Sequence, residues 1–372
     1  MGSKHVIIMG TRGVPAGHGG FETFAVYLCE FLLSRGWEVT VYCQEEGSGE
    51  RFVSDWKGVH RIHIPVTSSG PFGTIVFDWK SIIHSLRFSG VFLTLGYNTA
   101  VFNLLYRLTG KANIINMDGI EWKRRKWSAP VKAWFWLNER FGCWIGNHLV
   151  ADHPRIADHL ATRVSRSKIT TIPYGAREIR EADKSVLDEF GLRPDNYAVI
   201  IARSEPENSI LEAVTAFSAK RRNAKLLVLG KYTPDKNAFH RKVMKAASDE
   251  VLFPGAIYEA EKVDAIRFFS RVYLHGHQVG GTNPSLVEAL GAGNAVIAHD
   301  NPYNRWVAQD AASYFDSTAC AERAFDKAFA DEQWVAELRS AARKRFSESF
   351  QWQRVLEDYE SVLDRWLTHA LR

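Results

Sequence analysis

Residues 275–300, which read HGHQVGGTNPSLVEALGAGNAVIAHD, decide the fold of this chain. Apolar residues 272–274 precede the stretch and predict a short strand that runs into a loop with two adjacent glycines. A helix is predicted to begin next, because Asn283 can cap it and Pro284 occupies the first helical position, where its missing N–H costs nothing. Residues 295–298 predict a buried strand, so the stretch forms a strand–helix–strand unit.

The glycine-rich turn of this unit has the chemistry of an anion site. A strand that turns into a helix through glycines directs free backbone N–H groups and the positive end of the helix at one point, which suits a phosphate. Glu288 lies about one turn further into the helix, where a carboxylate is well placed for sugar hydroxyls beside that phosphate. A plain βαβ crossover with a solvated Glu288 is the alternative, because a lone glycine-rich turn is a weak signal.

Length and composition indicate a globular protein of two domains. The chain has 372 residues, 46% hydrophobic and 24% charged, which allows each domain its own core. Its net charge of +5 is mild and implies no nucleic-acid partner. The four cysteines are far apart, which favours reduced thiols in a cytoplasmic protein. No apolar run reaches the roughly 18 residues that span a bilayer, so we expect a soluble protein that can still touch a membrane.

A second strand–loop–helix unit opens the chain. Residues 5–9 (HVIIM) predict a buried strand, and apolar side chains at helical spacing predict a helix over about residues 21–34. The loop between them is of the nucleotide-binding kind, although its glycines do not fit the dinucleotide fingerprint GxGxxG. Gly19 and Gly20 place this helix start toward an anion. Glu22 in the first turn either complements the helix dipole or contacts a ligand.

Polar and basic residues follow a predicted strand at residues 112–116. Asp118 comes directly after it, at the carboxyl end where open α/β sheets hold their ligands. A basic run at residues 123–126 is bordered by Trp122 and Trp127. The run is interpreted either as a solvated face beside an aromatic core, or as a surface that touches anionic lipid head groups or a pyrophosphate.

The chain divides near Gly175, in a polar stretch after a predicted strand. We expect an N-terminal domain over residues 1–174 and a C-terminal domain over residues 175–349, with a C-terminal helix over about residues 350–372 that belongs to the first domain. The tail is predicted to pack through one apolar stripe, formed by Trp352, Leu356, Tyr359 and Leu363.

These motifs together resemble a known enzyme family. GGFET, IPYGA, the strand-end Arg203 and the helix around Glu288 occur in the order found in family 4 retaining glycosyltransferases of the GT-B fold. Four longer stretches, GTRGVPAGHGGFETF, DGIEWKRRKW, RSEPEN and residues 275–300, are similar to the branch that contains bacterial rhamnosyltransferases. The resemblance covers nearly the whole chain. It implies an α/β fold with two doubly wound Rossmann-like domains that face a central cleft, and a C-terminal helix that packs back on the N-terminal domain.

The resemblance also implies an activity. The chain would move a sugar, L-rhamnose from dTDP-L-rhamnose, to a lipid-linked saccharide acceptor in bacterial surface polysaccharide synthesis, with retention at the anomeric carbon. The expected location is the cytoplasm, peripheral to the inner face of the cell membrane and in contact with its anionic lipids. No cofactor besides the donor and no metal is expected, because no Asp, Glu, His or Cys cluster has ligand spacing.

The residue roles come from the same resemblance. Arg203 would grip the diphosphate as a planar cation, unless it forms a surface ion pair with Glu205 or Glu207. Glu288 would bind the nucleotide ribose, and Asp118 would face the donor sugar and the acceptor hydroxyl. The predicted donor-binding residues are Gly19, Gly20, Lys231, His275, His277, Gly281, Thr282 and Asn283. The predicted acceptor-side residues are Glu121, Lys123 and Arg124.

Two positions depart from the family pattern. Asn208 stands where the family has a Lys, five residues after its Arg, and Lys231 is the predicted replacement for that cation. Gly280 stands where the family has a Glu that contacts the sugar. His275 or His277 takes over that contact, or one of them is a buried, hydrogen-bonded structural histidine.

The predicted mechanism rests on charge stabilisation. Arg203 and the two helix N-termini would stabilise the leaving diphosphate, whose own oxygen takes the proton of the acceptor. Asp118 can assist. Two other functions stay open at this level: a nucleotide-sugar epimerase of the same fold, and a non-catalytic protein that binds a nucleotide sugar.

Overall fold

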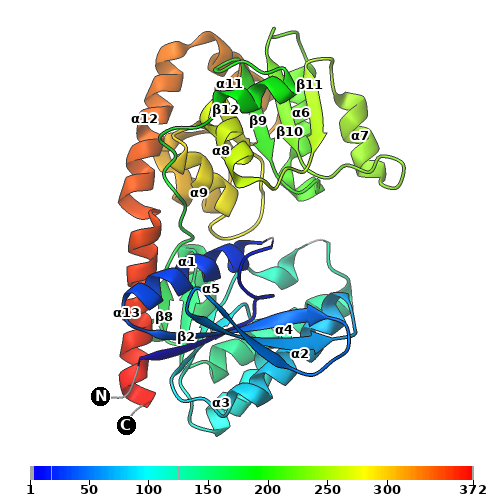
Figure 1. The fold of residues 1–372 in the computed structure, drawn as a ribbon. Helices are drawn as coiled ribbons and strands as arrows, with labels where there is room; N and C mark the ends of the chain where they lie inside the picture. The colour runs from blue at the N-terminus through cyan, green and yellow to red at the C-terminus, as the bar shows by residue number, and fades with distance from the viewer. Residues whose placement is uncertain (1–3, 18, 125, 371–372) are drawn as a thin grey trace. The chain divides into compact units, whose positions relative to one another are not determined.

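The protein is described by a computed structural model that covers residues 4–17, 19–124 and 126–370, with the backbone alone for residues 368–370. The chain divides into two compact units (Figure 1). Unit 1 comprises Met1–Pro173 together with Trp352–Arg372, and unit 2 comprises Tyr174–Gln351. Each unit is an α/β structure with its own sheet.

Unit 1 is built on an eight-stranded sheet with the order β3-β4-β2-β1-β5-β6-β7-β8. Its strands are β1 (His5–Met9), β2 (Glu38–Glu46), β3 (Phe52–Trp56), β4 (Val59–Val66), β5 (Val91–Leu95), β6 (Asn113–Asn116), β7 (His148–Ala151) and β8 (Ile169–Thr171). Neighbouring strands are parallel except for the β3–β4 hairpin. The central strand β5, VFLTL, is buried at every position, as expected for a parallel strand covered on both faces.

Helices cover this sheet, and one of them comes from the end of the chain. The helices of unit 1 are α1 (Gly20–Ser34), α2 (Gly70–Ser85), α3 (Leu104–Leu108), α4 (Ala129–Ile145), α5 (Pro154–Ala161) and α13 (Trp352–Ala370). The α13 stripe is buried and contacts α1, with ring centroids 4.6 Å apart both for Phe24–Tyr359 and for Tyr27–Trp352. The prediction that the C-terminal helix packs back on the N-terminal domain is confirmed.

Unit 2 carries a six-stranded, fully parallel sheet with the order β11-β10-β9-β12-β13-β14. Its strands are β9 (Tyr197–Ile201), β10 (Lys225–Leu229), β11 (Val251–Gly255), β12 (Val272–His275), β13 (Ala295–His299) and β14 (Ala312–Phe315). Its helices are α6 (Ile210–Ser218), α7 (Ala238–Ala246), α8 (Ala260–Phe268), α9 (Pro284–Gly291), α10 (Pro302–Ala308), α11 (Thr318–Ala330) and α12 (Glu332–Ser349). In chain order the strands run 3-2-1-4-5-6, which is the doubly wound arrangement of nucleotide-binding folds.

The core of unit 2 forms two layers, one on each face of the sheet. Tyr197 and Val199 of β9 belong to one buried apolar cluster, while Ala198 and Ile200 belong to the other, because successive side chains of a strand point to opposite faces. Helices α8, α9 and α10 contribute to the first cluster, and α6, α7 and α11 contribute to the second. The sheet is therefore a rigid platform whose strand ends hold the connecting loops in place.

Local sequence patterns predicted the elements around the site closely. The strands expected at residues 5–9, 272–274 and 295–298 are confirmed as β1, β12 and β13, and the last two extend by one residue. The helix expected over residues 21–34 begins one residue earlier, at Gly20.

Candidate functional site

The strand order of unit 2 reverses between β9, the first strand along its chain, and β12, the fourth. The loops that leave the carboxyl ends of these two strands therefore separate to opposite faces of the sheet, and open α/β sheets bind ligands at this point. Two hydrogen bonds join the loops across it. Gln278 donates its N–H to the carbonyl of Glu207 at 2.9 Å and its Nε2 to the hydroxyl of Ser209 at 3.0 Å.

Two exposed cations lie at neighbouring strand ends beside this point. Arg203 follows β9 and Lys231 follows β10, and Ser204 ties their loops together by donating its hydroxyl to the carbonyl of Lys231. Among the residues that the structure describes, neither cationic head group has a hydrogen-bond or ion-pair partner. The ion pair of Arg203 with Glu205 or Glu207 is therefore absent, and both charges are available to an anion.

Asn208 has a structural task in the first loop. It is buried, and its Nδ2 donates to the carbonyl of Arg203 at 2.8 Å. A Cβ at Gly276 would lie 2.1 Å from the carbonyl oxygen of Asn208, so the second loop packs directly on this turn. Asn208 holds the Arg203 loop in shape and supplies no charge.

The start of α9 differs from the expectation in one respect. Pro284 is at the beginning of the helix as predicted, but the side chain of Asn283 makes no capping hydrogen bond, so that prediction was wrong. The carboxamide lies over Gly280, where a Cβ would be 2.8 Å from its Oδ1. A side chain at residue 280 would compete with Asn283 for this space, and the φ of Gly280, +139°, also favours glycine. The local packing therefore fits glycine at position 280 and leaves no room for a longer side chain while Asn283 keeps this position.

Glu288 lies in α9 and has a partner that the sequence did not reveal. Arg267 of α8 donates its Nη2 to Oε2 of Glu288, and its side chain is only 6% exposed against 35% for Glu288. The ion pair orients the carboxylate and leaves part of it open to a ligand. A lone Arg within the helical segment AEKVDAIRF was the only signal for this contact.

The two histidines after β12 lie in different environments. His275 is fully buried, its ring stacks on that of His277 with centroids 4.3 Å apart, and neither ring nitrogen has a partner within the described residues. Burial and the neighbouring His277 and His299 hold the pKa of His275 well below its usual value, so the ring is neutral near pH 7. His277 is partly exposed, so of the pair it is the one placed to reach a ligand.

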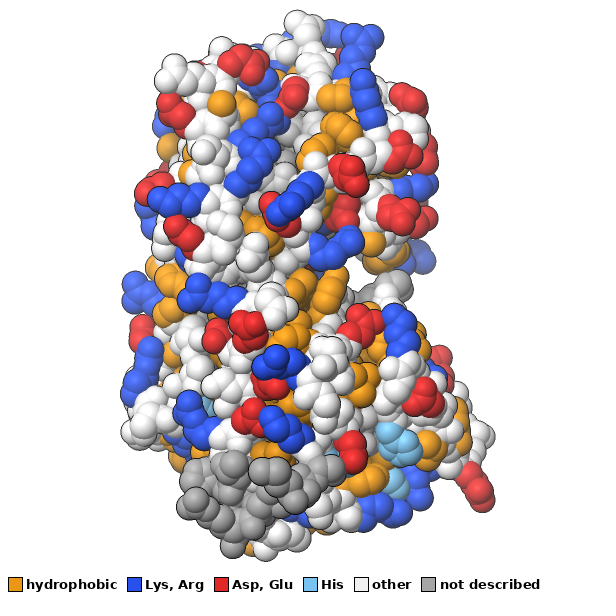
Figure 2. Space-filling view, turned by 60° about the vertical axis from the view of Figure 1, so that its left-hand side comes forward, with side chains coloured by type: hydrophobic (Ala, Val, Ile, Leu, Met, Phe, Trp, Pro, Cys, Tyr) orange, Lys and Arg blue, Asp and Glu red, His pale blue; other side chains and the backbone are white. Residues whose placement is uncertain are grey.

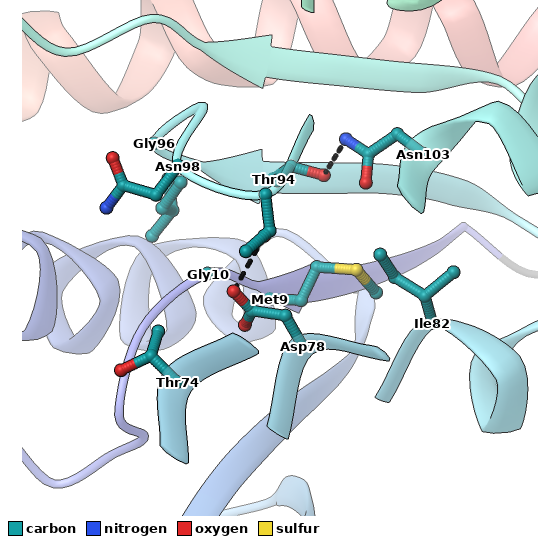
Figure 3. A pocket seen from close by; sticks show the side chains of 11 residues that line it. Met9, Gly10, Thr74, Asp78, Ile82, Thr94, Gly96, Asn98 and Asn103 are labelled. Atoms are coloured by element: carbon teal, nitrogen blue, oxygen red, sulfur yellow. Dashed lines mark hydrogen bonds between the residues drawn. The ribbon is translucent and has the colours of Figure 1, made fainter. Parts of the chain in front are cut away.

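Unit 1 has a corresponding reversal between β1 and β5. A small cavity of about 30 Å³ opens there, and Figure 3 shows Asp78 of α2 pointing into it. Thr99 donates its hydroxyl to Asp78 at 2.7 Å, and Asn103 donates to the Thr94 hydroxyl at 3.2 Å. Burial raises the pKa of Asp78 to about 7, against the opposing effect of the Thr99 hydrogen bond. Asp78 was not among the residues predicted for the site, because its only signal in the sequence is a carboxylate within an otherwise largely apolar helix.

Asp118 lies just beyond β6, as its position in the sequence predicted. Its backbone is left-handed, with φ +46°, and its N–H donates to Oδ1 of Asn116 at 2.9 Å. The same loop is tied to the end of β5, because Glu121 donates its N–H to the hydroxyl of Tyr97 at 2.9 Å. Asp118 and Glu121 therefore share the carboxyl edge of the unit 1 sheet.

The start of α1 is covered by a carboxylate. Glu22 accepts a hydrogen bond from the N–H of Arg12 at 3.2 Å, and a Cβ at Gly19 would lie 2.2 Å from its Oε2. The interpretation of Glu22 as a complement to the helix dipole is therefore favoured. A phosphate at Gly19 and Gly20 would require this carboxylate to move.

The predicted acceptor-side residues are largely paired with one another. Glu121 accepts from Nη1 of Arg124 at 2.9 Å and from Nε1 of Trp127 at 3.0 Å. The ammonium of Lys123 lies over the ring of Trp122, 5.4 Å from its centroid. Arg125, the third residue of the basic run, lies outside the described residues.

No group of three or more His, Cys, Asp or Glu side chains gathers as metal ligands within the part of the chain that the structure describes. None of the helices in this part of the chain combines the length and apolar character needed to cross a membrane.

Comparison with known proteins identified the fold. Residues 3–177 match a family described as a domain of unknown function (DUF1972), and no curated protein matches the chain. Among solved structures, the chain is similar to a sucrose-phosphate synthase from Thermosynechococcus elongatus, with a TM-score of 0.82 and 16% identity over 97% of this chain and 98% of that one. HepE of Anabaena, solved in complex with UDP and glucose, matches with a TM-score of 0.75 and 10% identity over 97% of this chain and 100% of that one.

A glycosyltransferase from Rickettsia africae matches with a TM-score of 0.72 and 13% identity over 99% of both chains. These likenesses confirm the predicted GT-B fold, with two Rossmann-like parallel-sheet units.

Proposed function

We propose that this chain is a glycosyltransferase whose donor, a sugar nucleotide with a diphosphate, binds at the carboxyl edge of the unit 2 sheet. The observation that carries the proposal is the pair of exposed cations, Arg203 and Lys231, which lie beside the switch point of that sheet and have no ion-pair partner among the described residues. The start of α9, which Asn283 leaves without a side-chain cap, lies at the same edge. The complexes of similar folds support the donor class, because HepE was solved with UDP and glucose.

Each of these groups has a role in the proposed reaction. Breaking the bond between the anomeric carbon and the diphosphate puts negative charge on the leaving oxygen. Arg203, Lys231 and the N–H groups of α9 would stabilise that charge in place, without reorganising during the step. Glu288, oriented by Arg267, would accept hydrogen bonds from the nucleotide ribose.

The finer assignment rests on the motif resemblance. The sugar would be L-rhamnose from dTDP-L-rhamnose, and the acceptor a lipid-linked saccharide in bacterial surface polysaccharide synthesis. The reaction would proceed with retention, with the acceptor's proton passing to the leaving phosphate oxygen. Asp118 would contribute from the acceptor side. The site of action would be the cytoplasmic face of the membrane.

A donor-binding panel tests this function. Isothermal titration calorimetry with dTDP-L-rhamnose, UDP-glucose, UDP-N-acetylglucosamine and GDP-mannose should show binding of one nucleotide sugar, with dTDP-L-rhamnose preferred. Preference for a UDP- or GDP-sugar would keep the glycosyltransferase proposal and discard rhamnose. Absence of binding to any donor would overturn the proposed function.

Lys231 provides a matched pair of variants for the same experiment. Lys231→Ala should weaken donor binding by about tenfold, because one charge-assisted contact to the diphosphate is lost. Lys236→Ala removes another exposed lysine of the same loop and should leave affinity unchanged. Equal effects of the two substitutions on donor affinity would show that Lys231 does not contact the donor.

A further inference from the structure

Exposed apolar side chains gather on three helices of unit 1. Eight of the twelve large hydrophobic residues that are exposed in the described chain belong to α2, α3 and α4. We call them the α2–α4 face: Phe72, Trp79, Ile83, Leu104, Leu108, Trp136, Leu137 and Trp144. Their exposure runs from 41% for Trp136 to 72% for Leu108, so folding of this chain does not bury them.

The three helices form one continuous surface. The short turn Ala100–Asn103 contacts all of them, with Phe102 against Trp79 at 5.1 Å between ring centroids and Val101 donating its N–H to Asn138 of α4 at 3.0 Å. Figure 1 shows α2, α3 and α4 on the same side of the unit 1 sheet. In each helix a buried residue follows an exposed one by two positions, about 200° around the helix axis. These buried residues are Ser81 of α2, Tyr106 of α3 and Asn138 of α4. The exposed side chains therefore point outward from one helical layer.

The charges on this surface all have one sign. The only acidic residues of the three helices, Asp78 and Glu139, are 8% and 1% exposed and point into the core. Their basic residues are Lys80, Arg107, Lys132 and Arg140. None of these four forms an ion pair with a described acid. Elsewhere the surface is mixed, as Figure 2 shows for a face on which Lys and Arg side chains are interspersed with Asp and Glu.

This combination fits a particular partner. Tryptophans and aliphatic side chains insert at the boundary between head groups and acyl chains, while Lys and Arg extend to lipid phosphates. Arg140 already lies 3.3 Å over the ring of Trp136, which pairs a cation with an amphipathic ring as a membrane interface requires. A second copy of the chain would oppose like charges at this face, which disfavours self-association.

We propose that the α2–α4 face docks unit 1 on a bilayer that contains anionic lipid. The face is distinct from the basic run at residues 123–126, where Arg124 is paired with Glu121. The proposal rests on the proposed function for its purpose, since a lipid-linked acceptor is reached only at a membrane. The surface itself is argued independently of the donor site.

Vesicle flotation tests the proposal with the full chain. The protein should float with vesicles that contain phosphatidylglycerol, bind pure phosphatidylcholine weakly, and bind less as salt rises, because head-group attraction is screened. Absence of binding to phosphatidylglycerol vesicles would overturn the proposal.

Two sets of substitutions locate the surface. The combined variant Trp79→Ser, Ile83→Ser, Trp136→Gln and Trp144→Gln should reduce vesicle binding at least tenfold. The variant Lys80→Gln, Arg107→Gln and Lys132→Gln should reduce it by about fivefold per residue. The matched control changes exposed residues of unit 2, Met244→Ser, Tyr258→Ser, Lys242→Gln and Lys245→Gln, and should float like the native chain.

Measurements of folding, donor binding and self-association distinguish membrane docking from a misfolded variant and from a contact between two copies of the chain. Circular dichroism and calorimetric donor binding of the apolar and the basic variant should match the native protein, since their substituted side chains are exposed or partly exposed on unit 1, whereas the proposed donor site belongs to unit 2. If the native chain binds vesicles but binds no donor, the proposed function is wrong and the proposed membrane contact of the α2–α4 face is still supported. Native protein that self-associates, and becomes monomeric in the apolar variant without ever binding vesicles, would show that a second copy covers the face and would overturn the proposal.

Discussion

The two sheets reverse their strand order at equivalent places, yet the two places differ in their electrostatics. In unit 2 the loops beyond β9 and β10 expose Arg203 and Lys231, and no acid neutralises them among the described residues. In unit 1 the corresponding edge holds the buried carboxyl of Asp78, and Glu22 covers the start of α1. Equivalent topology therefore supplies the position of a site in both units, while a few side chains make the edge of unit 2 cationic and the edge of unit 1 acidic. In the proposed function this difference assigns the diphosphate to unit 2.

The largest expected effect is on the rate of sugar transfer when Arg203 of unit 2 is replaced. Arg203→Ala should lower the rate of sugar transfer by about 10²–10³-fold, because a preorganised charge on the leaving group is lost. Glu22→Gln in unit 1 should change the rate far less, since that carboxylate complements a helix start. A steady-state transfer assay with the preferred donor measures both. Full activity of Arg203→Ala would contradict the proposed role of the unit 2 cations. Arg221→Ala changes another exposed arginine of the same unit and serves as the control, with a rate close to that of the native chain.

Asp78 should make unit 1 sensitive to pH. Burial raises the pKa of this carboxyl to about 7 from its ordinary 3.8, so between pH 3.8 and pH 7 the folded state keeps a proton that the unfolded state releases. Stability should therefore fall as pH rises through this window, by about 1.4 kcal/mol per pH unit, and level off above pH 7. Urea denaturation of the native chain and of Asp78→Asn at pH 5 and pH 7 measures it. Identical pH dependence in the two proteins would exclude a raised pKa at Asp78.

A glutamate at position 280, where the family that the motifs resemble has one, should destabilise unit 2. Gly280→Glu puts a Cβ 2.8 Å from Asn283 in a backbone with φ +139°, which should cost about 1–3 kcal/mol of unfolding free energy. Thermal unfolding measures the loss, and Asn283→Gly in the same chain should recover part of it. If Gly280→Glu is as stable as the native protein, Asn283 moves aside without a cost in unfolding free energy. Packing at Asn283 would then not account for the glycine at position 280.

The smallest effect is expected at the basic run of unit 1. Lys123→Gln with Lys126→Gln should lower binding to phosphatidylglycerol vesicles less than the triple substitution on α2, α3 and α4, because both ammonium groups lie over tryptophan rings. Flotation of the two variants side by side makes the measurement. A larger loss from the basic run would move the membrane contact to residues 123–126, as the sequence alone suggested.

Much of the candidate site was predictable from local sequence. Strand and helix boundaries around β1, β12, α9 and β13 follow from apolar runs, glycines and Pro284, which act within a few residues of one another. Arg203 and Lys231 come directly after strands, and parallel strands end at one edge of their sheet. The order of strands and helices was therefore enough to predict that Arg203 and Lys231 lie at the same edge of one sheet. The same reasoning placed Asp118 just beyond β6.

The remaining features depend on contacts that no local pattern encodes. Arg267 meets Glu288 from another helix, and the carboxamide of Asn283 turns over Gly280 instead of capping α9. The α2–α4 face exists only because three helices, separated in sequence by strands, share one layer whose acids point inward. The sequence by itself determined the elements, their order and the fold, since these follow from short-range periodicity and turn chemistry. Only the tertiary structure decided which charges are paired, buried or left exposed, because that depends on residues brought together across the sheet.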